Sequence, residues 1–230
     1  LGMKVYLDME TQYVTSKHLW WQDAVGNLNS PYADYLLFDD AAHLQPATMV
    51  FDLRFLKGYD GQIINVTTVN LKSPKVLDYN IALFSYFLDP NKDGKFDDGV
   101  DGFRLDHAMD HLDGKPTLTN LFAEFWKPLI AAVKKANPAV KIVAEQADWA
   151  DYGFAYFEKA TVDRMFGFGL QKAILSFDKQ QIIDNAEVIL RQTPAGKEQV
   201  IFIENHDIDR FASLDFELDK QKAAAALMLL

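Results

Sequence analysis

The sequence predicts an α/β fold in which parallel strands close into a (β/α)8 TIM barrel. Strand-like and helical segments alternate over residues 74–230, and such alternation is typical of parallel strands joined by right-handed helical crossovers. Three of the strand-like segments end in a carboxylate, and barrels of this class build their active site at the carboxyl ends of the strands. The two observations together predict a barrel with an acidic rim.

Five apolar or alternating runs are predicted as strands: residues 4–9, 100–106, 141–147, 162–166 and 199–205. Because successive strand side chains point to opposite faces, Arg104 and Asp106 share one face of the second run. A guanidinium on the same face as an acid favours the ionised acid, which is the form that a nucleophile needs.

Helical patterns separate most of these strands. The clearest helix is predicted at residues 118–136, with Thr117 or Thr119 as its N-cap and an end before Pro138. Residues 74–88 open with a proline that suits a first turn. Further helices are predicted at residues 169–191 and 219–230.

Composition and charge exclude several classes of function. The 230 residues carry a formal charge of −10, which would repel phosphate backbones, and no basic patch stands out, so we expect no nucleic-acid partner. The apolar run at residues 223–230 is shorter than the roughly 20 residues of a membrane span, so we expect no span in this segment. Because the chain starts on a strand and stops inside an apolar helix, we expect it to be a piece of a longer protein.

Cysteine is absent, which excludes disulfides and thiolate chemistry. The lack of cysteine fits the cytosol and a bacterial envelope about equally. The location is therefore left open, with an extracytoplasmic or secreted bacterial one slightly favoured.

Three motifs carry a family resemblance: VDGFRLD at residues 100–106, KIVAE at 141–145 and FIENHD at 202–207. Their order and spacing are similar to the fourth, fifth and seventh strands of the catalytic barrel in the alpha-amylase family, whose members are retaining enzymes acting on α-glucosidic bonds. The resemblance implies an incomplete barrel from about strand 3 to helix 7. Strand 3 would lie at residues 1–10, a small inserted domain B at 11–73, and helix 3 to helix 7 at 74–230.

The resemblance implies that Asp106 is the nucleophile, Glu145 the acid/base and Asp207 a third carboxylate that stabilises the oxocarbenium-like transition state. Retention needs an ionised and a protonated carboxyl about 5 Å apart. We expect Arg104 to keep Asp106 ionised, whereas the apolar residues 142–144 and nearby carboxylates should keep Glu145 protonated. Further substrate contacts are expected from Asp8, Tyr13, Arg104, His107, Trp149, His206 and Arg210.

The chain departs from the family pattern after the third strand, where Gln12 and Tyr13 replace the usual Asn and His. The usual interdomain calcium site is therefore in doubt. The sequence favours a hydrolase that cleaves starch-like or maltooligosaccharide chains by double displacement, without an organic cofactor. An α-glucan transglycosylase would share the covalent intermediate. A magnesium-dependent enolase-type barrel enzyme and a sugar-binding relative without catalysis are weaker alternatives.

An acidic loop at residues 89–99 resembles an EF-hand calcium loop. It has side-chain oxygens at alternate positions and Gly94 where such a loop turns sharply, although Val100 replaces the twelfth-position Glu. We expect a structural Ca²⁺ just before the strand that carries Asp106. Its predicted ligands are Asp89, Asn91, Asp93, Asp97 and the backbone carbonyl of Lys95.

Overall fold

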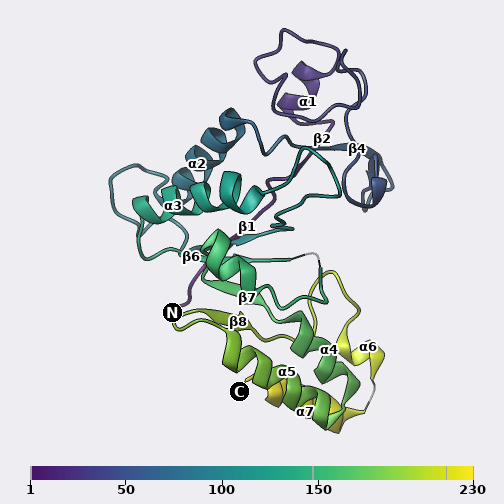
Figure 1. The fold of residues 1–230 in the computed structure, drawn as a ribbon, viewed down its shortest axis with the longest axis vertical. Coiled ribbons are helices and arrows are strands. Elements are labelled where there is room, and N and C mark those ends of the chain that lie inside the picture. The colour runs from purple at the N-terminus through teal and green to yellow at the C-terminus, as the bar shows by residue number, and fades with distance from the viewer. Residues whose placement is uncertain (1, 147, 216, 230) are drawn as a thin grey trace. The chain divides into compact units, whose positions relative to one another are not determined.

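The computed structural model describes residues 2–146, 148–215 and 217–229, so the parts of the predictions that fall on Leu1, Ala147 and Leu230 lie outside the described residues. The chain divides into two compact units, Leu1–Val140 and Lys141–Leu230, each described by itself (Figure 1). Within the described part of the chain, no helix combines the length and apolar character that crossing a bilayer requires.

Two short parallel strands position the acidic residues of the first unit. Strand β1 (Tyr6–Met9) pairs with β5 (Gly102–Leu105), with Asp8 opposite Arg104 and Met9 opposite Leu105. Phe103 and Leu105 of β5 are fully buried. Both strands are shorter than the predicted runs, 4–9 and 100–106. Before the two strands begin, a side chain replaces a strand-to-strand backbone bond: the carboxylate of Asp101 accepts a hydrogen bond from Val5 N at 2.9 Å.

Helices α2 (Pro74–Leu88) and α3 (Lys127–Ala136) lie side by side in this unit (Figure 1). The prediction of α2 is confirmed at both ends. Its buried residues recur every four positions (Val76, Asn80, Phe84 and Leu88), and the Phe84 ring packs 4.6 Å from that of Phe103 on β5. Beyond the helix, the chain returns so close to its end that a Cβ on Gly99 would lie 1.9 Å from the Leu88 carbonyl oxygen. Only glycine fits there.

The predicted helix at 118–136 is partly wrong. Helical structure starts at residue 121, continues through a π-helical turn at Phe122–Trp126 and then enters α3. Asn120 has φ +59°, which breaks the helical path before that point. No threonine caps the helix; instead Asp110 Oδ1 accepts from Phe122 N at 2.7 Å.

The segment between β1 and α2 holds a small antiparallel sheet in the order β2 (Tyr13–Thr15), β4 (Ile63–Thr68), β3 (Phe55–Lys57). It also contains α1 (Leu19–Ala24) and a 3-10 turn at Val50–Asp52. The sheet lies inside residues 11–73, where the inserted domain was placed; the boundaries of that domain stay a prediction.

In the second unit, β6 (Lys141–Ala144), β7 (Arg164–Phe166) and β8 (Glu198–Val200) run parallel, with β7 between the other two. The predicted strand at 199–205 is wrong beyond Val200. After Val200 the backbone is no longer paired with β7, and the Ile203 carbonyl instead accepts a hydrogen bond from Gln171 Nε2 at 3.2 Å. The motif FIENHD is consequently a loop that follows a strand.

Helices pack beside these strands (Figure 1). The predicted helix at 169–191 is two helices, α4 (Phe168–Ser176) and α5 (Lys179–Gln192), because Phe177 has φ +51° and Asp178 caps the second through a 2.9 Å bond from Gln181 N. A π-helical turn at Tyr156–Ala160, α6 (Phe211–Leu214) and α7 (Leu218–Met228) complete the unit.

Candidate active site

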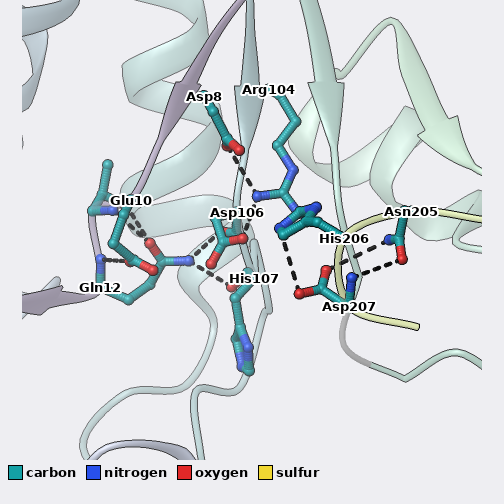
Figure 2. A network of polar contacts seen from close by, with 10 residues as sticks. Asp8, Glu10, Gln12, Arg104, Asp106, His107, Asn205, His206 and Asp207 are labelled. Carbon is teal, nitrogen blue, oxygen red and sulfur yellow. Dashed lines mark hydrogen bonds and ion pairs between the residues drawn. The ribbon is translucent and has the colours of Figure 1, made fainter. Parts of the chain in front are cut away.

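Arg104 joins two carboxylates at the carboxyl end of the first unit's strand pair (Figure 2). Its Nη1 donates to Asp8 Oδ1 at 2.9 Å and also to Asp106 Oδ1. Its side chain is only 12% exposed, whereas the side chain of Asp106 is 27% exposed and that of Asp8 58%, so water competes mainly for the bond to Asp8. The structure thus brings together three of the predicted site residues, and the direct cause is the β1 to β5 register.

The surroundings of Asp106 favour its ionised form. Burial by itself would raise the pKa of this carboxyl, but a hydrogen bond with Glu10 and the charge of Arg104 outweigh that effect, and the net result is a lowered pKa. An ionised carboxylate at neutral pH is the state in which Asp106 could attack an electrophilic carbon.

Glu10 is a residue that the sequence interpretation missed. It follows β1 directly, and its Oε1 accepts from Gln12 N at 2.8 Å. The residue as a whole is exposed, and with Tyr13 it lines a cavity of about 430 Å³. Its carboxyl group nevertheless lies among the strand ends, where loss of solvation and the hydrogen bond with Asp106 raise its pKa well above the usual value. The signal in the sequence was the spacing of Asp8 and Glu10, which puts both on one face of the strand.

Gln12, one of the departures from the family pattern, is completely buried and joins the exits of both strands (Figure 2). Its Nε2 donates to the backbone carbonyls of Asp106 and His107, the latter at 2.8 Å, while its Oε1 accepts from Thr11 N and Oγ1 at 2.7 and 2.8 Å. The amide therefore fixes the backbone that carries Asp106, and both its donor and acceptor groups are satisfied.

Tyr13 and His107 meet at a third acid, Asp113. The Tyr13 hydroxyl donates to Asp113 Oδ2 at 2.6 Å, and His107 Nε2 lies 3.3 Å from Asp113 Oδ1. Loss of solvation, followed by the bond to Asp113, raises the pKa of the Tyr13 phenol, so the group stays neutral. The hydroxyl that was expected to contact sugar is thus engaged with Asp113, a residue that nothing in the local sequence singled out.

Glu145 directly follows β6 in the second unit and is 6% exposed. The three residues before it, Ile142, Val143 and Ala144, are buried as well. The carboxyl group of Glu145 therefore lies at the carboxyl end of a strand, where the acid was predicted, and directly follows three buried apolar residues.

Trp149, His206 and Asp207 line one open pocket of about 570 Å³ in the second unit. Asp207 N donates to Asn205 Oδ1 at 3.0 Å, and His206 Nε2 lies 3.4 Å from Asp207 Oδ1 (Figure 2). Trp149 stacks on Phe168 at 5.0 Å between ring centroids. Three predicted site residues therefore share one concave surface that includes an aromatic ring and a carboxylate.

Arg210 does not line that pocket. Its Nη1 donates to Glu204 Oε1 at 3.0 Å, and Glu204 Oε2 accepts from Phe211 N at 2.6 Å. The arginine thus closes the loop between β8 and α6, and its expected substrate contact stays a prediction.

The predicted calcium loop is held by its own backbone. Asp89 Oδ1 and Oδ2 accept from Asp93 N and Gly94 N at 3.1 and 2.9 Å, and Asp93 Oδ1 accepts from Lys95 N at 2.8 Å. Across residues 2–146, 148–215 and 217–229, no group of three or more acidic or histidine side chains is gathered closely enough to hold a metal. As described, the side chains do not form a ready ligand set, and the calcium site stays a prediction.

Known proteins similar to this chain agree on one family. Comparison with models of protein families gives no match. Alpha-amylase 3 from Dictyoglomus thermophilum is 26% identical over 99% of this chain and 44% of its own length. A 4-alpha-glucanotransferase from Thermotoga maritima is 26% identical over 100% of this chain and 50% of its own. The crystal structure of an alpha-amylase from H. orenii superimposes with a TM-score of 0.75, at 23% identity, over 99% of this chain and 48% of that one.

These similarities support the predicted resemblance to the alpha-amylase family. The predicted fold is confirmed as well: it is a partial (β/α)8 barrel of the alpha-amylase type. The chain spans about half the length of the curated relatives that it matches. What the whole protein acts on is therefore a matter for proposal.

Proposed function

We propose that the full-length protein is a retaining glycoside hydrolase that cleaves α-glucosidic bonds in starch-like or maltooligosaccharide substrates. The observation that carries this proposal is the Arg104 bridge between Asp8 and Asp106, which leaves Asp106 ionised at a strand end. The names of the family relatives, an alpha-amylase and a 4-alpha-glucanotransferase, support an α-glucan as the substrate.

In this proposal each carboxyl has one task. Asp106 attacks the anomeric carbon, and Glu145 gives a proton to the leaving oxygen, so that a covalent glycosyl intermediate forms and the aglycone departs neutral. Glu145 then removes a proton from the incoming water, which releases the sugar with its original configuration and regenerates both groups. Asp207 stabilises the positive charge of the two transition states, and Trp149 offers a face for sugar stacking. The mechanism requires the carboxyls of Asp106 and Glu145 to lie about 5 Å apart around the substrate.

A product analysis tests the proposal. We expect the full-length protein to release reducing sugar from soluble starch and maltooligosaccharides, and the first product detected by NMR should be the α-anomer. A first product in the β-configuration would rule out retention, and no release of reducing sugar from any α-linked glucan would rule out the hydrolase.

A transglycosylase is a second candidate, because one of the family relatives is a 4-alpha-glucanotransferase. The covalent intermediate is the same, and a sugar hydroxyl takes the place of water in the second step. Incubation with maltotriose alone separates the two activities: a transferase makes longer oligosaccharides with no net gain in reducing ends, whereas a hydrolase increases reducing ends from the start.

We also propose that the loop at residues 89–99 binds a structural Ca²⁺, which would require Asp93 and Asp97 to turn toward Asp89. An ion at about 100 times its Kd stabilises the folded state by about 2.7 kcal/mol. Calcium should therefore raise the melting temperature of the wild type, and Asp93→Asn should greatly reduce that increase. Asp60→Asn, in another Asp-Gly turn, is the matched control. Equal calcium-dependent increases in both variants would place the ion elsewhere.

A further inference from the structure

The register of β1 and β5 places two acids next to each other at their carboxyl ends. Met9 is opposite Leu105, so the next position brings Glu10 beside Asp106, and a 3.1 Å bond from Asp106 N to Met9 O shows that the pairing continues that far. Neighbouring strands lie about 4.8 Å apart, and side chains in register on the same face are in contact range. The register therefore brings the carboxyl groups of Glu10 and Asp106 within reach of each other.

Two carboxyls in contact share a proton, because one neutral acid can donate to one carboxylate whereas two carboxylates repel each other. The position of the cation decides which acid keeps the proton. Arg104 donates to Asp106, so negative charge is favoured there. Glu10, by contrast, accepts at its Oε1 from the neutral backbone N–H of Gln12 at 2.8 Å.

We propose that Glu10 is a positioning residue of the proposed active site, a neutral acid at working pH whose hydroxyl donates a hydrogen bond to Asp106 and so keeps the nucleophile ionised and oriented. The proposal rests on the proposed role of Asp106. The raised pKa of Glu10 and the lowered pKa of Asp106 agree with this division of charge. Other titratable groups surround the pair. Asp8 lies on β1 and Tyr13 at the start of β2, whereas Arg104 lies on β5 and His107 and Asp113 follow it.

The chemistry predicts different outcomes for two replacements in the full-length protein. Glu10→Gln keeps an N–H donor on a side chain of the same shape. The acid limb of the pH profile, where kcat/KM falls as the pH is lowered, should therefore stay at the wild-type pH. Glu10→Met keeps the volume and removes the donor, so the pKa of Asp106 should rise, moving the acid limb up by about one pH unit and lowering kcat/KM roughly tenfold below it. Glu158→Gln, at an exposed glutamate of the other unit, is the control and should leave the limb in place.

Two results would overturn the proposal. If Glu10 were ionised, Glu10→Gln would remove a repulsive charge and shift the acid limb to lower pH. If Glu10 only supported the fold, Glu10→Met would lower the melting temperature without moving the limb.

A measurement without substrate separates this proposal from the proposed function. In ¹³C NMR titrations of the side-chain carboxyls, a glutamate signal that titrates well above the usual pH in the wild type and in Glu145→Gln should be missing from Glu10→Gln. Inactivity on every α-glucan together with this signal would refute the hydrolase and retain the carboxyl pair. Activity without the signal would refute the pair alone.

Discussion

Asp106→Asn in the full-length protein is expected to lower kcat on maltooligosaccharides by at least about 10³-fold with little loss of stability. The amide cannot form the glycosyl ester, and a removed nucleophile typically costs several orders of magnitude. Asparagine has nearly the same shape, and its oxygen can still accept from Arg104, which is why the fold should persist. The measurement is steady-state kinetics beside a thermal unfolding curve.

Glu145→Gln tests the partner in the same reaction. Loss of a general acid costs about 10²–10⁴-fold when the leaving group needs a proton. An α-glucosyl fluoride needs none to depart, so Glu145→Gln should lose much less of the glycosylation rate on this substrate, whereas Asp106→Asn should stay inactive on both. This contrast distinguishes the two roles more sharply than activity alone.

A matched control is the acid just before the strand that leads to Asp106. Asp101 sits at the opposite end of β5, where it pairs with Lys4 at 2.7 Å. Asp101→Asn should leave kcat nearly unchanged, because that end of a barrel strand contributes to stability. Near-wild-type turnover in Asp106→Asn, or a similar loss in Asp101→Asn, would contradict the assignment.

Local sequence patterns predicted those elements whose causes are local. Helix α2 was found at both ends, because its proline start and its four-residue apolar repeat are contained in its own 15 residues. The strand that precedes Asp106 was found because two apolar residues alternate with Arg104 and the acid. The predicted single helix at 169–191 failed because a left-handed Phe177 depends on packing, which a helical pattern does not encode.

Contacts between distant segments could not be predicted in the same way. Asp113 accepts a hydrogen bond from the hydroxyl of Tyr13, which lies 100 positions earlier in the chain. The local sequence around one residue does not predict the other. The pairing of Glu10 with Asp106 depends on the register of two strands, and a slip by one residue would turn Glu10 to the other face. Glu10 was visible in the sequence as an acid, but its place beside Asp106 was not.

Removal of the guanidinium is the second large effect that the structure predicts. Arg104→Leu would leave Asp8 and Asp106 without the cation between them, and the half-buried Asp106 would lose a charge-assisted hydrogen bond. We expect kcat/KM to fall about 100-fold or more, and its acid limb to move up by about 1–3 pH units, because the carboxylate loses its counter-charge.

Arg104→Lys should retain part of the activity, because an ammonium is a point charge without the planar fork that joins two carboxylates. The control is Arg164→Leu, which removes an arginine that pairs across β7 and β8 with Glu198 at 2.5 Å, at the start of a strand. That variant should lose stability and keep the wild-type acid limb. If Arg104→Leu also kept the limb, then the guanidinium would not control the charge of Asp106, and the link between the strand register and a reactive carboxylate would be lost.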